Sequence, residues 1–370
     1  MKITRIRVYR TDLPYVDGAY VWGAGNAITM AMTSVVVVDT DAGLSGCGEF
    51  CPCGENYMDA HSQGVEAIAR LLAPKLLGED PRQVARMERL MDHTVRGHGY
   101  AKAPFDAAFW DIFGKATGEP VWMLMGGKLT NGAPMYRVAP QRSVEETKAE
   151  LERHRAAGYR QFQIKVGGDW EGDIDRIRST VPLLKKGERA MADANQGWRV
   201  DNAIRVAEAT RDLDYIFEQP CRTYEECQQV RRHVAQPMKL DECVTGLAMA
   251  QRIVADRGAE ICCLKISNLG GLTKARRVRD FLIDSGIAVV SEDTWGGEIT
   301  TAAVAHFAAS TPEEYLINTT ELMSYNTRST GIGGPVSEGG KLFVTDTPGL
   351  GVEPDFDSLG EPVADYGVAA

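Results

Sequence analysis

An α/β barrel, preceded by a smaller α+β region, is the fold class that the sequence predicts. The main observation is a series of short apolar runs, each ending in a charged residue, as in Phe162-Gln163-Ile164-Lys165. Such runs are typical of buried parallel strands with a functional side chain at the carboxyl end. The second observation is their spacing, because successive runs leave room for one helix and two loops between strands. The residues that end five consecutive runs are Lys165, Asp193, Glu218, Asp241 and Lys265.

The flanking sequence extends this pattern to a modified TIM barrel of the (β/α)7β type. A first strand is expected at 135–138, a seventh at 287–293 and a shorter eighth at 315–319. No low-complexity linker interrupts the chain, so a tight domain interface is expected. We expect an α+β capping domain over 1–125, the barrel over 126–323, and a C-terminal segment, 324–370, that packs back on the capping domain.

The elements of the capping domain follow from local patterns. Residues 3–10 alternate between apolar and polar side chains and predict a half-buried strand. The β-branched run at 35–38 and the run at 44–49 predict an antiparallel meander. Helices are expected to begin at Pro81 and Pro104, because proline is favoured in the first helical turn and apolar residues follow at helical spacing.

Two aperiodic segments interrupt this first domain. Residues 15–26 are rich in glycine and aromatic side chains, and residues 50–57 contain Pro, Cys and Gly. Long loops in compact domains are often functional. We expect both segments to close over the barrel mouth as lids, with Tyr20 and Tyr57 as candidate substrate contacts.

Composition restricts the class of function. The chain has 370 residues and a formal net charge of −10, which argues against nucleic acid or an anionic membrane as a partner. No apolar run reaches the roughly 18 residues of a membrane span, and the N-terminus does not resemble a signal peptide. The eight cysteines, including Cys51 and Cys53, predict reduced structural thiols. We therefore expect a cytoplasmic protein with a small-molecule substrate.

The acids at three consecutive strand ends form the first candidate site. Asp193, Glu218 and Asp241 would lie side by side on the barrel rim, where they repel one another unless a cation neutralises them. Oxygen ligands without cysteine or histidine suit Mg²⁺, with Mn²⁺ as the alternative. A structural alternative is that these acids are helix N-caps or ion-pair partners. Three in succession at this spacing favour the metal site.

Lys165 and Lys265 are the candidate catalytic residues. Their strands would lie on opposite sides of the mouth, so a substrate held between them would face one amine on each side. A nearby divalent cation lowers the pKa of a lysine toward the range that a general base needs. The structural alternative, a solvated charge at a strand end, is disfavoured by their placement on both sides of the acids.

With these motifs, the sequence resembles an enolase-superfamily enzyme of the muconate-lactonising type over nearly the whole chain. Segment 103–115 resembles the family's capping domain. The sequences Asp-Ala-Asn from Asp193, Glu-Gln-Pro from Glu218 and Asp-Glu from Asp241 resemble its three metal motifs. Leu264-Lys265 with the glycine pair at 270–271 resembles its sixth-strand motif. The resemblance implies α-proton abstraction by a lysine through an enediolate, with Mg²⁺.

One position departs from the family pattern. The branch usually carries Lys-x-Lys on the second strand, whereas this sequence has Gln163-Ile164-Lys165. The lysine usually assigned to proton transfer is kept, but it loses a cationic neighbour. The mandelate-racemase branch uses a His–Asp pair instead. That branch is disfavoured because the histidines, at positions 61, 93, 98, 154, 233 and 306, do not fall at the ends of strands six or seven.

The resemblance also narrows the substrate class. The region 318–322 lacks the Asp-x-Asp pair with which dipeptide epimerases grip an ammonium, so dipeptides are disfavoured. Trp295 could present its indole face to a cyclic or cationic amine, or it could instead plug the barrel rim. These details resemble the hydroxyproline-acting members. Further candidates for substrate contacts are Asp293, Gln163 and Asn195.

That resemblance implies dehydration of cis-3-hydroxy-L-proline to a pyrroline-2-carboxylate. The alternative is epimerisation at C2 of proline betaine or 4-hydroxyproline betaine by two-base proton transfer. By resemblance Lys165 is the base and Lys265 the acid, although the sequence alone leaves this assignment open. A non-catalytic barrel that only binds a ligand is a further alternative, against which the intact five-residue set argues. A homo-oligomer is expected.

Overall fold

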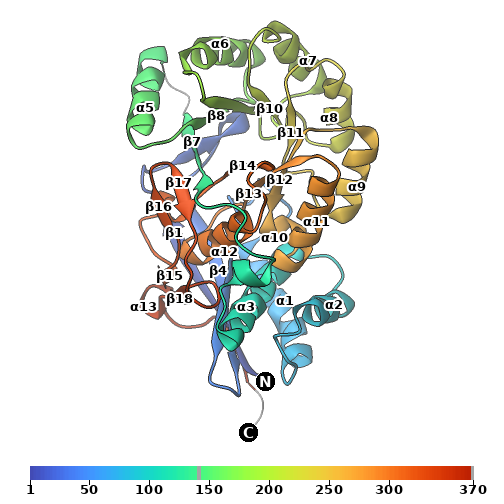
Figure 1. Ribbon diagram of the computed structural model, residues 1–370, viewed down its shortest axis with the longest axis vertical. Helices are drawn as coiled ribbons and strands as arrows, with labels where there is room; N and C mark the ends of the chain where they lie inside the picture. Colours follow the sequence, from blue (N-terminus) through green and yellow to red (C-terminus); the bar gives the residue numbers. More distant parts are fainter. Residues whose placement is uncertain (140–142, 368–370) are drawn as a thin grey trace.

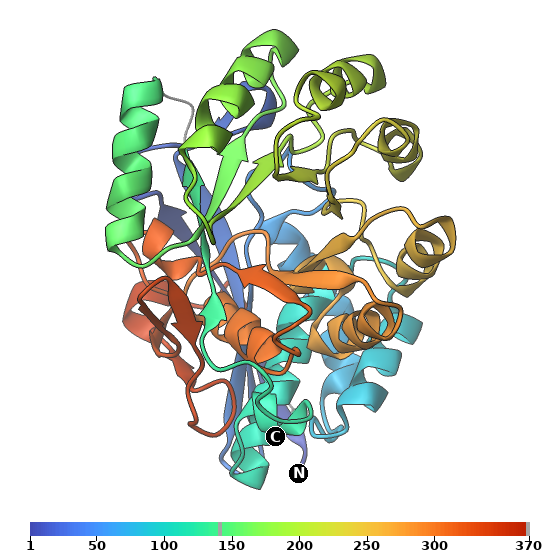
Figure 2. The same cartoon turned by 45° about the horizontal axis from the view of Figure 1, so that its top comes forward.

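Eight parallel strands form one sheet in the order β14-β13-β12-β11-β10-β9-β8-β7, in a computed structural model that describes residues 1–139 and 143–367. A parallel bridge between Met135 and Thr319 joins the two edges, so the sheet curves into a near-closed barrel (Figure 2). The strands are β7 (Tyr136–Ala139), β8 (Gln161–Lys165), β9 (Arg189–Asp193), β10 (Ile216–Glu218), β11 (Met238–Leu240), β12 (Ile261–Lys265), β13 (Ala288–Glu292) and β14 (Leu316–Thr319).

Helices connect these strands and lie outside the sheet (Figure 1). Their sequence alternation with the strands confirms the (β/α)7β barrel. The connecting helices are α5 (Val144–Ala156), α6 (Trp170–Thr180), α7 (Val200–Ala209), α8 (Tyr224–Arg231), α9 (Leu247–Asp256), α11 (Leu272–Asp284) and α12 (Glu298–Ala309), with the short α10 (Ile266–Leu269) before α11 and a 3₁₀ turn (Val181–Leu183) after α6.

Local sequence signals start several of these helices. Ser143 and Thr223 each form a capping box, in which the hydroxyl accepts a hydrogen bond from the third helical N–H and a glutamate side chain accepts one from the cap N–H. The side chain of Asp169 caps α6 by accepting from the N–H of Gly172. These caps fix where the three helices begin.

The capping region is built on an antiparallel sheet of order β19-β1-β4-β5. Two glycines of β5 let helix α3 approach this sheet closely, because a Cβ atom at Gly48 would lie 2.0 Å from the carbonyl oxygen of Pro104 and one at Gly46 would lie 2.3 Å from that of Ala108. The elements are β1 (Ile3–Pro14), β4 (Met30–Thr40), β5 (Ser45–Phe50), α1 (Ser62–Leu76), α2 (Val84–Thr94), α3 (Gly99–Thr117) and α4 (Val121–Leu124).

Three details of this region differ from the sequence prediction. Helix α2 begins at Val84 rather than at Pro81. Helix α3 begins at Gly99 and contains Pro104, because packing against β5 stabilises a further turn despite the N–H that proline lacks. The segment 15–26 is not wholly a loop, since β2 (Tyr20–Trp22) and β3 (Asn26–Ile28) form a short hairpin around a 3₁₀ turn at Gly23–Gly25.

The C-terminal segment returns to the capping sheet. Strand β19 (Ala364–Gly367) pairs antiparallel with β1, with Tyr366 opposite Ile6. Residues 368–370 of the expected segment lie outside the described residues. The remaining elements are β6 (Ala133–Pro134), a 3₁₀ turn (Met323–Tyr325), β15 (Gly331–Gly333), β16 (Val336–Glu338), β17 (Lys341–Phe343), β18 (Val352–Pro354) and α13 (Phe356–Leu359).

One apolar core continues from the capping region into the barrel. It joins Val35 and Trp110 of the cap to Leu272 and Val289 of the barrel. A separate cluster that includes Met191 fills the barrel interior. All eight cysteines are free and buried, as predicted. Among the described residues, no helix is long and apolar enough to span a membrane.

Candidate active site

A small cavity of about 50 Å³ lies where the barrel strands end. Barrel residues form its floor, and aromatic residues of the capping region cover it. Glu218 is fully buried and does not reach the cavity surface. The other residues predicted as site residues all line the cavity: Tyr20, Tyr57, Gln163, Lys165, Asp193, Asn195, Asp241, Lys265, Asp293 and Trp295.

Lys165 forms one side of this cavity. It ends β8 directly beside Asp193, which ends β9 in the same register. Its Nζ atom lies 2.6 Å from Oδ2 of Asp193 and donates to Oδ1 of Asn195 at 2.9 Å. Burial is the largest influence and would lower the pKa of Lys165, but the charge of Asp193, its hydrogen bond and further negative neighbours such as Glu218 together raise that pKa well above its ordinary value. Lys165 is therefore an ammonium in this arrangement.

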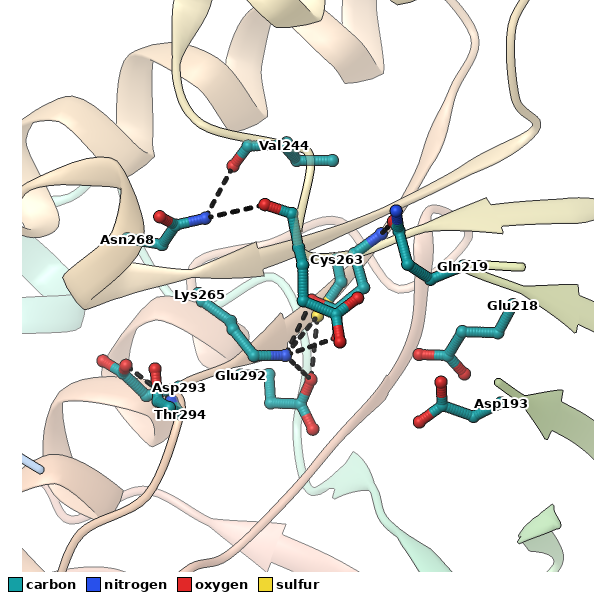
Figure 3. A network of polar contacts seen from close by, with 12 residues as sticks. Asp193, Glu218, Gln219, Val244, Cys263, Lys265, Asn268, Glu292, Asp293 and Thr294 are labelled. Carbon is teal, nitrogen blue, oxygen red and sulfur yellow. Dashed lines mark hydrogen bonds and ion pairs between the residues drawn. The ribbon is translucent and has the colours of Figure 1, made fainter. Parts of the chain in front are cut away.

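Lys265 forms the second buried ammonium of the cavity, at the end of β12 (Figure 3). Its Nζ atom lies 2.6 Å from both carboxylate oxygens of Asp241 and 3.2 Å from Oε2 of Glu292. Burial again opposes the charge, and the carboxylate of Asp241 again raises the pKa of the lysine well above its ordinary value. Each lysine is thus paired with an aspartate, and the two lie on strands separated by β9, β10 and β11.

Glu218 lies on β10, between the strands of the other two acids. Its carboxylate points toward that of Asp193 in Figure 3. Burial, together with the charges of Asp193 and Asp241, raises the pKa of Glu218 to about 7. Two neighbours offset this effect: Nζ of Lys239 lies 2.6 Å from Oε1, and Nε2 of Gln163 donates to Oε2 at 3.3 Å.

These acids fit a hard divalent cation by their chemistry, since all three present carboxylate oxygens. Each of these carboxylates lies 2.6 Å from a lysine ammonium group: Asp193 from Lys165, Glu218 from Lys239 and Asp241 from Lys265. Among the described residues, the group of three or more acid, thiol or imidazole side chains whose ligand atoms all lie within 4.8 Å of one another is Asp241, Cys263 and Glu292. Each carboxylate therefore has a positively charged partner, and the same three groups have the chemistry of ligands for a divalent metal ion.

Sequence reasoning missed Lys239 and Glu292. Glu292 lines the cavity and accepts hydrogen bonds from Tyr136 and from Sγ of Cys263, the latter at 2.8 Å. Burial opposes its charge, but Lys265 and Lys239 lower the pKa of Glu292 to about 2. Strand alternation could have found both residues: Lys239 lies two positions before Asp241, and Glu292 is in register with Lys265, so each shares the face of a predicted site residue.

Aromatic side chains cover the cavity, and Trp295 is central to this cover. Its ring lies 5.1 Å from that of Tyr20 and 5.6 Å from that of Tyr325, and its Nε1 donates to Oδ1 of Asn326 at 2.9 Å. The indole is only 4% exposed. Trp295 therefore both plugs the barrel rim and lines the cavity, so the two sequence interpretations do not exclude each other.

Each lysine also faces a tyrosine from one of the two expected lid segments. Nζ of Lys165 lies 6.0 Å from the ring centre of Tyr20, and Nζ of Lys265 lies 5.7 Å from that of Tyr57. The hydroxyl of Tyr57 contacts Oδ2 of Asp241 at 3.4 Å. An antiparallel bridge between Cys51 and Trp295 attaches the second lid segment to the barrel.

A closed barrel whose mouth holds two buried lysines and a row of acids under an aromatic cover has the architecture of a barrel enzyme. The family comparison agrees with this class. Residues 146–358 match the enolase C-terminal domain-like family, and residues 23–126 match the N-terminal domain of the mandelate racemase and muconate lactonizing enzymes. The chain is an enzyme that belongs to the enolase superfamily, and its resemblance to the muconate-lactonising members is confirmed.

Individual relatives cover the whole chain. The chain is 45% identical to cis-3-hydroxy-L-proline dehydratase of Roseibium aggregatum, over 99% of this chain and 100% of the relative. A mandelate racemase/muconate lactonizing enzyme from Roseovarius nubinhibens ISM is 78% identical, with a TM-score of 0.97 over 100% of this chain and 99% of the other. A relative from the same organism, complexed with magnesium, has 34% identity and a TM-score of 0.94 over 99% of this chain and 100% of that one.

Proposed function

We propose that the protein dehydrates cis-3-hydroxy-L-proline in a Mg²⁺-dependent reaction. The observation that carries this proposal is the pair of buried lysines, Lys165 and Lys265, on strands separated by the three that bear the acids. The 45% identity to a dehydratase of this substrate over the whole chain supports the choice of reaction. The magnesium complex of a relative supports the choice of ion.

Asp193, Glu218 and Asp241 would hold the ion. When bound, it would supply positive charge to the substrate carboxylate, on which negative charge develops as the α-proton leaves. Every other part of the chemistry falls to side chains of this chain. Lys165 must give up its proton and its contact with Asp193 before it can act as a base, whereas Lys265 must keep its proton to act as an acid.

The stereochemistry of the substrate suits two lysines on opposite sides. In cis-3-hydroxy-L-proline the hydroxyl and the carboxylate share one face of the ring, so the α-hydrogen lies on the other face. Lys165 would take the α-proton, and the electrons of that C–H bond would form the C2–C3 double bond. The C3–O bond would break as Lys265 donates a proton to the hydroxyl, and water would leave with the pyrroline-2-carboxylate as product.

The aromatic cover favours a second candidate, epimerisation at C2 of proline betaine or 4-hydroxyproline betaine. The faces of Tyr20, Trp295 and Tyr325 around the cavity would attract a quaternary ammonium by cation–π interaction. The same two lysines would then take a proton from one face and return it to the other. The two reactions share removal of the α-proton and differ in the second proton transfer, which goes to the C3 hydroxyl in dehydration and to the opposite face of the α-carbon in epimerisation.

A panel of proline derivatives in D₂O, followed by NMR, tests both candidates. For dehydration we expect cis-3-hydroxy-L-proline to lose its C3 hydroxyl and give the pyrroline, whereas the trans isomer, whose α-hydrogen and hydroxyl share a face, should not react at a comparable rate. If betaines exchange and epimerise while cis-3-hydroxy-L-proline is unchanged, the dehydratase proposal is wrong and the second candidate replaces it. If no compound exchanges its α-hydrogen, both candidates are wrong.

A further inference from the structure

Gln163 and Lys239 contact the same carboxylate from opposite sides. Gln163 lies on β8, and its Nε2 donates to Oε2 of Glu218 at 3.3 Å. Lys239 lies on β11, in register with Glu218, and its Nζ lies 2.6 Å from Oε1. Glu218 therefore has a neutral donor on one side and a cation on the other.

Lys239 differs from Lys165 and Lys265 in its access to the cavity. Lys165 and Lys265 line the cavity, so their ammonium groups can meet a substrate. Lys239 has no exposed surface and does not line the cavity. It therefore does not touch a substrate there and acts through neighbouring carboxylates, and the one that it contacts is Glu218.

The positive charge of Lys239 compensates the negative charge of the buried Glu218 carboxylate. Glu218 has no exposed surface, and the carboxylates of Asp193 and Asp241 end the strands on either side of it. A buried carboxylate is tolerated only with a partner that compensates its charge. The contact between Lys239 and Glu218 is an ion pair without hydrogen-bond alignment, so it acts mainly through charge.

The sequence explains why this charge stands on β11. The family branch that the chain resembles carries a lysine at the position of Gln163, two residues before the catalytic lysine. Here that position is neutral, while Lys239 brings an ammonium to the same carboxylate from the next strand. In this chain the positive charge that contacts Glu218 is thus that of Lys239, on the side opposite Gln163.

We propose that Lys239 is a positioning residue that supplies the fixed positive charge beside Glu218, replacing the charge absent at Gln163. It holds the carboxylate in place when no ion is bound, and it moderates the affinity for a divalent ion when one is. The second part rests on the proposed Mg²⁺ site, whereas the first part does not.

A charge-swap experiment tests this proposal on purified full-length protein. The variants are Lys239→Met, Gln163→Lys and the double variant, each measured for thermal midpoint in EDTA and in Mg²⁺, and for the Mg²⁺ dissociation constant by calorimetry. Lys239→Met should lower the midpoint in EDTA by about 5 °C or more, because Glu218 loses its counter-charge. Mg²⁺ should recover much of that loss and should bind about tenfold more tightly, because the repelling ammonium is gone.

Gln163→Lys should have the opposite effect on the ion. A second ammonium beside Glu218 should weaken Mg²⁺ binding by about tenfold while the fold persists. The double variant returns one charge to Glu218 from β8, so its midpoint in EDTA and its Mg²⁺ affinity should both approach those of the wild type. Such non-additivity is the signature of two residues that act on one carboxylate.

The matched control is Lys102→Met. Lys102 is as buried as a barrel lysine, at 2% exposure, but its partner is Asp92 in the capping region, at 2.7 Å. The thermal midpoint of this variant should fall by the same amount in EDTA and in Mg²⁺. The proposal is overturned if the thermal midpoint of Lys239→Met in EDTA equals that of the wild type, or if adding Gln163→Lys does not restore that midpoint. It is also overturned if Gln163→Lys alone binds Mg²⁺ with the affinity of the wild type.

The experiment also separates this inference from the proposed function. If the wild type shows no Mg²⁺ response, the proposed metal site is wrong, and the swap in EDTA still decides whether Lys239 compensates Glu218. If the swap behaves as expected but no proline derivative reacts, the substrate is wrong and the role of Lys239 stands.

Discussion

Buried acids occur in two regions of this molecule, and their partners differ in kind. At the interface between the capping region and the barrel, two buried acids, Glu49 and Asp106, have backbone N–H and hydroxyl groups as partners. Glu49 accepts from the N–H groups of Gly297 and Thr300, at 3.0 and 2.9 Å. Asp106 accepts from the N–H and the hydroxyl of Thr273, at 2.9 and 2.6 Å. Both acids thus cap the first turns of barrel helices, α12 and α11.

At the barrel mouth, by contrast, the three acids of the proposed metal site have the ammonium groups of lysine side chains as partners. Asp193 contacts Lys165, and Asp241 contacts Lys265, each at 2.6 Å. A backbone donor can leave an acid only if the helix moves, whereas an ammonium on a four-carbon chain can move alone. The interface acids therefore hold the domains together, and the mouth acids can exchange one cation for another. We therefore place the catalytic function at the barrel mouth, where another cation can replace a lysine ammonium group as the partner of an acid.

Removal of divalent ions should reduce activity more than any of the substitutions described below. In EDTA we expect turnover to fall below detection, because the mouth acids would keep their lysines as partners and Lys165 would stay protonated. Added Mg²⁺ should restore turnover. Full activity after exhaustive EDTA treatment would show that the mouth acids, like those of the interface, have only a structural role.

Replacement of either mouth lysine should have the next largest effect. Lys165→Ala and Lys265→Ala should each reduce dehydration by about 10²- to 10⁴-fold, the usual value of a proton transfer in catalysis. The variants should differ in the exchange of the α-hydrogen of L-proline with D₂O, which needs a base but no acid. Lys265→Ala should retain some exchange and Lys165→Ala should not. Wild-type exchange in both variants would mean that neither lysine is the base.

At the interface the measurable quantity is stability, and its pH dependence has a defined sign. Burial raises the pKa of Asp106 from 3.8 to about 6, although the hydrogen bonds from Thr273 oppose the shift. The folded protein thus binds this proton more tightly than the unfolded chain. The contribution of Asp106 to stability is full below pH 4 and is lost as the pH rises through 6.

Asp106→Asn removes this titration while keeping the shape of the side chain. The free energy of unfolding of the variant, relative to the wild type, should therefore rise by about 2 kcal/mol between pH 4 and pH 7, as measured by urea unfolding. Asp80→Asn is the control with opposite sign, since hydrogen bonds from Arg82 lower the pKa of that exposed acid. Its contribution is lost as the pH falls. A pH-independent difference for Asp106→Asn would refute the assignment of a raised pKa to the buried carboxyl of Asp106.

The sequence predicts the barrel because its strands recur at regular spacing. It predicts the lysines and acids of the mouth because each of them ends such a strand. Strand ends in a parallel barrel meet at one rim, so spacing alone brings Lys165 and Lys265 into one cavity. The start of α3 could not be predicted in the same way, since it depends on how Gly46 and Gly48 admit the helix. The hairpin at 20–28 depends on contacts of Tyr20 with Trp295, which lies far away in the sequence.

The charges inside the barrel show a different limit. Lys239 and Glu292 share strand faces with predicted residues. The alternation of side chains along a strand therefore indicates which way they point, but not which groups they contact. Which cation meets which acid depends on side-chain reach across the barrel, for example from Lys265 to both Asp241 and Glu292. The predicted ligand set therefore stays a proposal, and the ion pairs that neutralise it came only from the structure.

The smallest effect is expected where the two kinds of region meet, at Tyr57. This residue belongs to the capping region, yet its hydroxyl contacts a mouth acid, Asp241, at 3.4 Å, which is a long hydrogen bond. Burial, with the charge of Asp241, raises the pKa of Tyr57 well above its ordinary value, so the hydroxyl keeps its proton. Tyr57→Phe preserves the ring that faces Lys265 and removes only this contact. We expect kcat/KM to fall by less than about tenfold, in line with one weak hydrogen bond, with little change in Mg²⁺ affinity. Tyr20→Phe is the matched change on the Lys165 side. If both variants lose activity equally, the tyrosines act as cover alone; if Tyr57→Phe alone shifts Mg²⁺ affinity by more than tenfold, Tyr57 helps to hold Asp241, and the capping region contributes to the exchangeable site after all.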